Sequence, residues 1–222
     1  MALPGCCDST DRHFTSARAN TELRRYQRRG PTGTARRLLR MLTEAQVQAD
    51  TLLDVGGGVG VLAHEFLAAG SGTAVEVEVA GAYVEAARSE AARRGHLDRV
   101  AFVQGDAVDL AARLESADLV TLDRVLCCYP DLQPLLQTTA GKARRYWAGS
   151  FPRERWFIRL KMRWENARRA RAGNQFRSYV HSVVAIYALL EQAGLTPLRI
   201  HRGLFWEVVV FVRQDGPGAS RG

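Results

Sequence analysis

The fold is decided by residues 52–60, which read Leu52-Leu53-Asp54-Val55-Gly56-Gly57-Gly58-Val59-Gly60. An apolar run leads directly into a glycine turn, and a helical pattern follows it through about Ala69. This strand–turn–helix arrangement is typical of α/β proteins that bind a ligand at the carboxyl end of the first strand. We expect the glycines to let the backbone approach that ligand, because a Cβ would collide with it.

The spacing of residues within the turn indicates which kind of ligand it binds. The pattern is GxGxG, and Val61 stands where a dinucleotide fingerprint would have glycine. No Lys-Ser or Lys-Thr follows, which excludes a phosphate-binding loop. Asp54 precedes the first glycine by two residues, and its charge is unfavourable beside a pyrophosphate but favourable beside an ammonium and a sulfonium. The turn therefore favours S-adenosylmethionine (SAM).

Short apolar runs alternate with helical patterns through the middle of the chain, which predicts a parallel sheet with crossover helices. The expected fold class is α/β, a Rossmann-like three-layer sandwich whose seven-stranded, mostly parallel sheet ends in a C-terminal antiparallel hairpin. We expect strands at residues 51–55, 73–79, 100–104, 119–122, 145–150, 197–201 and 205–212. We expect helices at residues 14–29, 32–42, 82–94, 131–144 and 182–193.

The expected organisation has one binding domain with additions. Residues 1–49 are interpreted as an N-terminal helical lid segment, and residues 50–214 as the SAM-binding domain, which contains a helical insertion at 151–177. Residues 215–222 are expected to be a disordered tail.

Acidic residues recur at the ends of the next three expected strands. Glu78 ends the second strand, Asp106 follows the third, and Asp123 follows the fourth. In this order, and behind the glycine turn, they make residues 50–212 resemble the class I SAM-dependent methyltransferases. The resemblance implies SAM contacts from Asp54, Gly56, Gly57, Gly58, Gly60, Glu78, Val79, Asp106, Ala107, Asp123 and Arg124.

The resemblance also assigns roles, each with an alternative. Glu78 would hold the ribose hydroxyls, although Glu76 shares its strand face. Asp106 would lie beside the adenine amino group, or else only cap the segment that follows it. Asp123 would lie under the methionine moiety, or else only shape its loop. If the N-terminal segment folds over the cofactor, Tyr26 and Gly30 would border the methionine end; otherwise the segment is a pair of surface helices.

The sequence Cys127-Cys128-Tyr129-Pro130-Asp131 follows the fourth strand, where open α/β sheets place their ligands. Tyr129 and Cys128 are therefore candidates for contacting the methyl acceptor. The cysteines either pack as small apolar residues or form a thiolate pair for a soft metal, joined by Cys6 and Cys7. We expect no metal site. CCYPD also gives a more distant resemblance to bacterial proteins similar to magnesium-protoporphyrin O-methyltransferases.

The insertion at residues 151–177 is rich in arginine and tryptophan. Trp156, Phe157, Leu160 and Trp164 recur at helical spacing, and we expect this stripe to pack in the core or in a lid, or to form an aromatic wall for the acceptor. Arg153 and Trp156 are candidates for binding the acceptor, Arg153 through a carboxylate or phosphate. If the acceptor must lose a proton, the candidate bases are Asp123, Tyr129 and His181.

The net charge of +8 is unevenly distributed. Residues 41–141 hold six Arg against fifteen Asp or Glu, whereas the flanking segments 12–40 and 142–177 are strongly basic. These flanks could steer an anionic acceptor or a nucleic acid, or could be solvated helix faces. No run of 18 apolar residues and no secretory signal pattern occurs, so we expect a cytoplasmic protein without a membrane span.

The predicted function is methyl transfer from SAM to a small molecule, with an anionic or planar acceptor favoured by the basic, aromatic insertion. An RNA methyltransferase is an alternative, although the chain lacks an NPPY or DPPY tetrad after the fourth strand. A non-catalytic SAM-binding protein is another. We expect a monomer or a homodimer.

Overall fold

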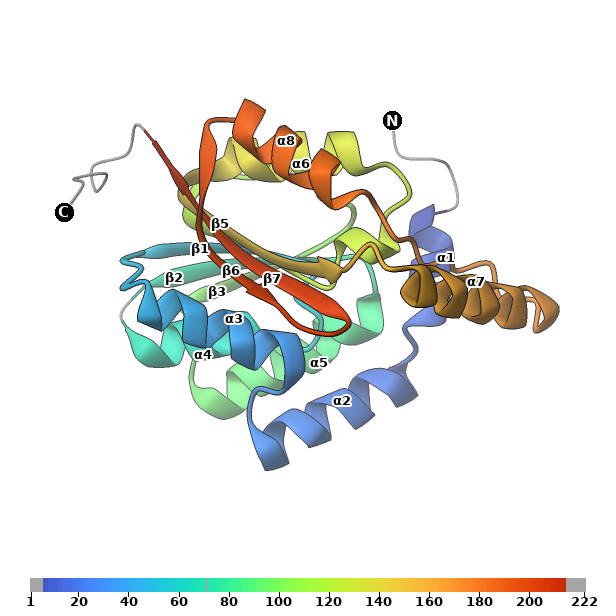
Figure 1. The fold of residues 1–222 in the computed structure, drawn as a ribbon. Helices are drawn as coiled ribbons and strands as arrows, with labels where there is room; N and C mark the ends of the chain where they lie inside the picture. Colours follow the sequence, from blue (N-terminus) through green and yellow to red (C-terminus); the bar gives the residue numbers. More distant parts are fainter. Residues whose placement is uncertain (1–5, 71, 215–222) are drawn as a thin grey trace.

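A seven-stranded sheet forms the centre of the computed structural model, which describes residues 6–70 and 72–214 (Figure 1). The strand order is β3-β2-β1-β4-β5-β7-β6, and β7 runs antiparallel to both of its neighbours. The predicted fold class is confirmed. The strands are β1 (Thr51–Val55), β2 (Thr73–Glu78), β3 (Val100–Gln104), β4 (Ala117–Asp123), β5 (Ala143–Pro152), β6 (Leu195–Arg202) and β7 (Trp206–Arg213).

Helices cover both faces of this sheet (Figure 1). One face carries α3 (Gly33–Glu44), α4 (Val61–Ala69) and α5 (Gly81–Arg94); the other carries α6 (Leu132–Lys142) and α8 (Val183–Gln192). Each face has its own apolar core, because the strands are buried on both sides and read as continuous apolar runs. Among the described residues, no helix is long and apolar enough to cross a membrane.

Two helices, α1 (Cys6–His13) and α2 (Ser16–Arg29), precede α3 in the chain. The helix α2 packs on α5, with Leu23 and Tyr26 against Tyr83. The helix α1 was not expected from the sequence. The expected tail at residues 215–222 lies outside the described residues.

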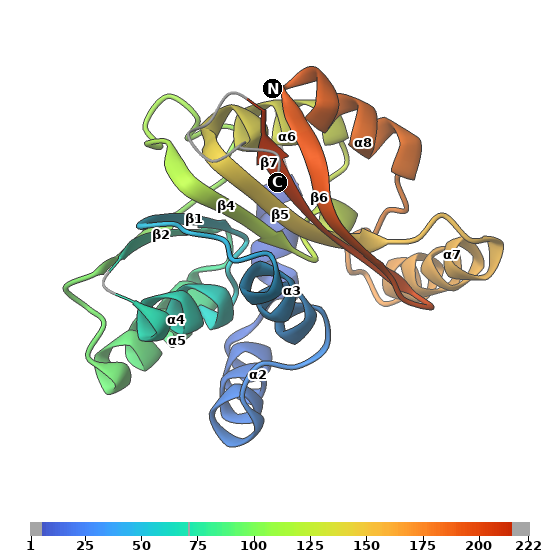
Figure 2. The ribbon, with the colours of Figure 1, turned by 60° about the vertical axis from the view of Figure 1, so that its left-hand side comes forward.

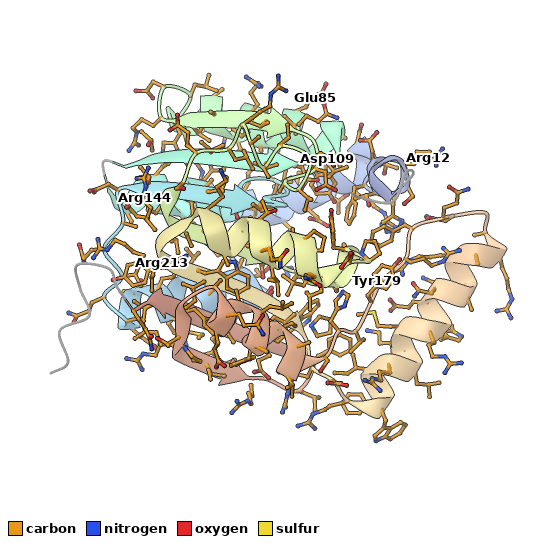
Figure 3. The ribbon with its side chains drawn as sticks, turned by 90° about the horizontal axis from the view of Figure 1, so that it is seen from above. Arg12, Glu85, Asp109, Arg144, Tyr179 and Arg213 are labelled. Carbon is orange, nitrogen blue, oxygen red and sulfur yellow. The ribbon has the colours of Figure 1, made fainter. Side chains whose placement is uncertain are left out.

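The insertion forms one helix, α7 (Trp156–Arg171), which extends away from the sheet (Figures 2 and 3). Its buried residues are Ile158 and Met162. Trp156, Leu160 and Trp164 are 76%, 60% and 59% exposed, so the expectation that this stripe packs in the core is wrong. Helical spacing shows which residues share a face, but not which face meets the rest of the protein.

The strand order reverses between β1 and β4, since β1 leads to β2 on one side and borders β4 on the other. Open α/β sheets form a crevice at such a point, at the carboxyl ends of the strands. The glycine turn after β1 and the segment after β4, which includes the short 3₁₀ helix Leu126–Cys128, therefore meet at one edge.

Candidate active site

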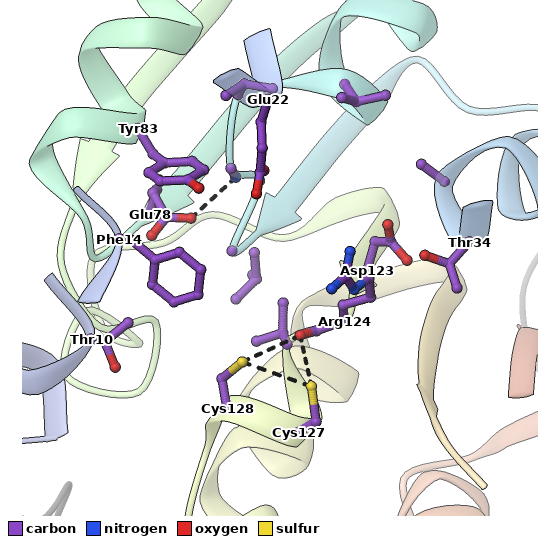
Figure 4. Close-up of a pocket in the computed structure, with 18 of the residues that line it drawn as sticks. Thr10, Phe14, Glu22, Thr34, Glu78, Tyr83, Asp123, Arg124, Cys127 and Cys128 are labelled. Atoms are coloured by element: carbon purple, nitrogen blue, oxygen red, sulfur yellow. Dashed lines mark hydrogen bonds between the residues drawn. The ribbon is translucent and has the colours of Figure 1, made fainter. Parts of the chain in front are cut away.

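A pocket of about 690 Å³ opens at this edge of the sheet (Figure 4). Its floor is formed by the glycine turn and by the segments that follow β2, β3 and β4. Side chains of α1, α2 and α7 line the rest, together with the hairpin tip between β6 and β7. The volume is within the range of pockets that hold small molecules and cofactors.

At most positions of the turn, glycine is required because a Cβ would clash with other side chains of the protein. A Cβ at Gly57 would lie 2.5 Å from Cγ of Glu76, and one at Gly60 would lie 2.7 Å from Nε2 of His64. Gly58 differs, because its nearest neighbour would be a ring carbon of Tyr83 at 3.7 Å. Its φ of +65° also disfavours any side chain. Gly58 is therefore the glycine of the turn at which we still expect a Cβ to collide with a ligand rather than with the protein.

Glu78 connects the end of β2 to the glycine turn. Its carboxylate accepts hydrogen bonds from the backbone N–H groups of Gly58 (3.1 Å) and Ala80 (2.9 Å). Burial raises the pKa of Glu78, although these hydrogen bonds act in the opposite direction. Glu78 and Val79 both line the pocket.

A row of polar side chains crosses three strands beneath the glycine turn. Thr121 of β4, Asp54 of β1 and Glu76 of β2 are register neighbours, so their side chains share a face of the sheet. Thr121 donates a 2.6 Å hydrogen bond to Oδ1 of Asp54, whereas Oδ2 of Asp54 and both carboxyl oxygens of Glu76 are buried without a partner. Burial, with repulsion from Asp123 and Glu78, raises the pKa of Asp54 to about 7. A cationic ligand would be favoured beside such groups.

Burial also raises the pKa of Glu76, and we predict that Glu76→Gln makes stability less dependent on pH. A carboxyl whose pKa is higher in the folded state retains its proton while the unfolded chain loses it. The stability of the parent should therefore fall, as pH rises from the pKa of the unfolded chain, by about 1.4 kcal/mol per pH unit. The neutral amide lacks this loss. Urea unfolding at pH 5 and pH 8 should give an advantage to the variant only at pH 8.

The matched control is Glu85→Gln, which changes an exposed acid on α5. Parallel pH profiles for the parent and Glu76→Gln would contradict a protonated Glu76.

Asp123 ends β4 at the centre of the pocket. Ser150, its register neighbour on β5, donates a 2.5 Å hydrogen bond to Oδ1 of Asp123 and accepts one from the backbone N–H of Arg124. Burial raises the pKa of Asp123 despite the hydrogen bonds from Ser150 and Thr34. Arg124 has a φ of +63°, a strained conformation for arginine that is characteristic of functional sites.

Asp106 and Tyr129 meet across the pocket floor. The Tyr129 hydroxyl lies 3.1 and 3.2 Å from the two carboxyl oxygens of Asp106, to which it donates. Asp106 also accepts a hydrogen bond from the backbone N–H of Val108, so it does cap the turn that follows, and Ala107 lies beside it in the pocket. His181 is outside the lining, where its Nε2 lies 2.9 Å from the carbonyl oxygen of Tyr129.

The two cysteines after β4 line the pocket below Arg124 (Figure 4). Their sulfur atoms are 3.8 Å apart, and both thiols donate to the carbonyl oxygen of Arg124. Their mutual hydrogen bond and the charge of Arg124 lower the pKa of Cys127. Cys6 and Cys7 have no described side chains. Among the described residues, no group of three or more His, Cys, Asp or Glu could hold a metal ion.

Two cations in the lining of the pocket lie over aromatic rings. The Arg124 guanidinium is 5.2 Å from the ring centroid of Trp206, and the Lys161 ammonium is 4.7 Å from that of Phe205. All four residues line the pocket. We call them the cation–aromatic wall.

Arg153 and Trp156 lie outside the lining of the pocket. Arg153 donates to the carbonyl oxygen of Gly203 (3.0 Å) and lies 3.8 Å from Glu207, so it anchors the hairpin tip that carries Phe205 and Trp206. Trp156 is exposed to solvent. The structure therefore brings the expected cofactor residues together with the exception of Gly60, which lies outside the lining against His64 and Glu76. It does not bring these two expected acceptor residues into the pocket.

Tyr26 and Gly30 of the N-terminal segment both line the pocket, and the Tyr26 hydroxyl donates to Glu65 at 2.6 Å. Several other residues of the lining were not expected from the sequence, because they come from distant segments. Figure 4 shows Glu22 reaching toward Tyr83, and Phe14 beside Glu78. The only signal for them was the helical pattern of residues 14–29, which does not say what the helix covers. The further residues of this kind include Thr10, His13, Thr34, Lys161, Met162 and Arg169.

Residues 52–144 match the model of the methyltransferase domain family. The matched segment contains the glycine turn and the strands β1, β2, β3 and β4, and the match agrees with the resemblance to the class I SAM-dependent methyltransferases. The pocket is compatible with SAM as a cofactor, because the carboxyl groups of Asp54, Glu78 and Asp123 that line it suit a cation and the open side of Gly58 leaves room for a ligand.

Several solved methyltransferase structures share the fold of this chain. Magnesium protoporphyrin IX methyltransferase from Synechocystis PCC 6803, with bound S-adenosylhomocysteine, is 18% identical with a TM-score of 0.68, covering 92% of this chain and 98% of its own. An O-methyltransferase family protein from Burkholderia thailandensis is 16% identical with a TM-score of 0.66, covering 93% of this chain and 62% of its own. Human N-acetylserotonin methyltransferase, in complex with SAM, is 17% identical with a TM-score of 0.61, covering 90% of this chain and 57% of its own. No curated protein matches the chain.

Proposed function

We propose that this protein transfers the methyl group of SAM to a small, planar and anionic acceptor. The proposal rests on the cation–aromatic wall, which lines the same pocket as the carboxyl groups at the ends of β1, β2 and β4. A cationic cofactor is favoured beside the carboxyl groups, and a planar, anionic acceptor is favoured beside the cations and rings of the wall.

The cofactor end is assigned to residues of the sheet edge. Glu78 would hold the ribose hydroxyls while its hydrogen bonds to Gly58 and Ala80 keep the turn in place. Asp106 and Ala107 would recognise the adenine ring, with Asp106 exchanging its bond to Tyr129 for the amino group. The remaining contacts would come from Asp54, Gly56, Gly57, Gly58, Asp123, Arg124, Tyr26 and Gly30, which all line the pocket. Gly60 does not line it and would act by shaping the turn.

The acceptor end is assigned to the wall and to Cys128 and Tyr129. The rings of Phe205 and Trp206 would stack on a planar acceptor, and the charges above them would pair with its carboxylate or phosphate. Arg153 would act indirectly, by anchoring the hairpin tip.

SAM supplies a methyl group on a sulfonium, and transfer proceeds by in-line displacement once the acceptor atom is aligned. A carboxylate acceptor needs no base. For an acceptor that must lose a proton, Asp123 is the best placed of the three candidates, because it lines the pocket as a carboxylate, whereas the Tyr129 hydroxyl donates its proton to Asp106 and His181 lies outside the lining. Burial raises the pKa of Asp123, which makes its carboxylate a stronger base.

The test is formation of S-adenosylhomocysteine with aromatic acids and, in parallel, with their neutral amides. We expect turnover of acids only. Arg124→Gln and Lys161→Gln should each raise KM for the acid about tenfold, because each removes one charge-assisted contact. For Lys161→Gln, whose side chain is assigned only to the acceptor, SAM affinity should change less than about twofold.

The control is Arg113→Gln, which removes an exposed arginine that does not line the pocket. Equal turnover of acids and amides would contradict an anionic acceptor. Tight, steeply salt-dependent binding of mixed RNA would instead support the RNA methyltransferase. No turnover of any acceptor despite tight SAM binding would support the non-catalytic protein.

A further inference from the structure

The outer face of α7 is apolar although nothing in the described structure covers it. Trp156, Leu160 and Trp164 are spaced four residues apart and therefore form one stripe along the helix. All three are more than half exposed, whereas Ile158 and Met162, on the opposite side, are 0% and 8% exposed. The helix thus has two apolar faces, of which only one is used for packing.

The stripe is extended by the hairpin tip between β6 and β7. Leu204, at this tip, is 74% exposed. The backbone N–H of Arg153 donates to the carbonyl oxygen of Phe205 at 2.9 Å, which fixes the tip beside the start of α7. Figure 2 shows the tip of this hairpin close to the base of α7. We call Trp156, Leu160, Trp164 and Leu204 the outer apolar patch.

Positive charge borders the patch. The helix contains six Lys or Arg and one Glu. At 100° per residue, Arg159 and Arg163 fall on one side of the stripe, and Lys161 and Arg168 on the other. Arg168 lies 5.3 Å from the ring centroid of Trp164.

We propose that this patch docks the protein on a membrane surface that contains anionic lipid. A helix with Trp and Leu on one face and Lys or Arg beside it lies in the interface, with its apolar side chains at the level of the headgroups. Tryptophan is enriched at this depth. The flanking cations can extend along the surface and pair with the headgroups of acidic lipids.

The composition of the patch favours a membrane surface over a second copy of the chain or a nucleic acid. A second copy of the chain would bring the cations that border its own patch against these, and charged residues are depleted from the centres of protein interfaces. A nucleic acid would use stacking rings beside the cations, but Leu160 and Leu204 offer no ring to a base. The proposal is independent of the proposed function, since docking requires neither cofactor nor acceptor.

The experiment is sedimentation of the full-length protein with sucrose-loaded vesicles of phosphatidylcholine, with or without phosphatidylglycerol. We expect binding only to vesicles that contain phosphatidylglycerol, and weaker binding as salt rises. The triple variant Trp156→Ala, Leu160→Ala, Trp164→Ala should lower the partition coefficient about tenfold or more. Arg163→Gln should lower it about fivefold.

The matched control is Val184→Ala, because Val184 is an apolar residue of α8 that is 78% exposed. It should bind vesicles as the parent does. Unfolding curves should be the same for all variants, since the patch is not packed. Equal binding to both kinds of vesicle, or full binding by the triple variant, would overturn the proposal. So would a parent that fails to bind vesicles but forms a dimer, or binds mixed RNA, through the same three residues.

Discussion

Replacing Gly58 with arginine should abolish measurable SAM binding in a calorimetric titration. The backbone at Gly58 has a φ of +65°, which costs about 1–2 kcal/mol for any L side chain. The new side chain would also enter the pocket, since a Cβ at this position meets only Tyr83 at 3.7 Å. Its charge would occupy the end of the pocket that is assigned to a cationic cofactor. Together these effects should weaken binding by about a thousandfold or more.

Gly173→Arg is the matched control for this variant. Gly173 has a φ of +70° in the turn after α7, and a Cβ there would meet nothing within 4 Å. The substitution therefore introduces the same backbone strain and the same charge away from the pocket. It should lose a similar amount of stability and bind SAM as the parent does. Binding by Gly58→Arg that equals binding by Gly173→Arg would contradict the assignment of the glycine turn.

The second large effect is expected for Glu78→Ala, which should weaken SAM binding by about a hundredfold or more. The carboxylate is assigned to two ribose hydroxyls, and hydrogen bonds to a charged group contribute about 1.5–3 kcal/mol each. It also holds the N–H groups of Gly58 and Ala80, so the free energy of unfolding should fall by about 1–3 kcal/mol. Titration calorimetry and urea unfolding measure the two effects separately.

Glu78→Gln tests which effect dominates, because its single amide oxygen can still accept from one of the two backbone N–H groups but carries no charge. It should recover part of the stability and less of the affinity. Glu85→Ala, on the exposed side of α5, is the control for loss of an acid. SAM affinity of Glu78→Ala within about twofold of the parent would show that another group holds the ribose.

The sheet could be predicted because its strands are short apolar runs separated by helical patterns. Strand ends were less accurate. The strand β5 runs from 143 to 152 rather than 145 to 150, because Tyr146–Pro152 pair with β7 along their whole length. A run such as Ala148-Gly149-Ser150 has little strand preference of its own, and long-range pairing decides its conformation.

The acids of the site could be located at strand ends, but their environments depend on register. Thr121 fixes Asp54, and Ser150 fixes Asp123, only because each pair is aligned across neighbouring strands. The same alignment buries Glu76 under the glycine turn. A single sequence does not give the register between strands that are 20 to 70 residues apart.

The least predictable part of the site is the lining that comes from outside the sheet edge. Glu22, Phe14, Lys161 and Trp206 reach the pocket from segments whose periodicity predicts a helix or strand but not its neighbour. The same limit explains α7, whose stripe of Trp and Leu had the spacing of a core face and is exposed.

The central claim is that SAM lies on the glycine turn, with its reactive end between Asp123 and the cation–aromatic wall. A crystal structure of the protein with S-adenosylhomocysteine tests it most directly. We expect the ribose hydroxyls within hydrogen-bond distance of Glu78, the adenine amino group beside Asp106, and the sulfur facing the part of the pocket that Arg124 lines. Density for the ligand elsewhere, or an adenine ring at the wall of Phe205 and Trp206, would contradict it.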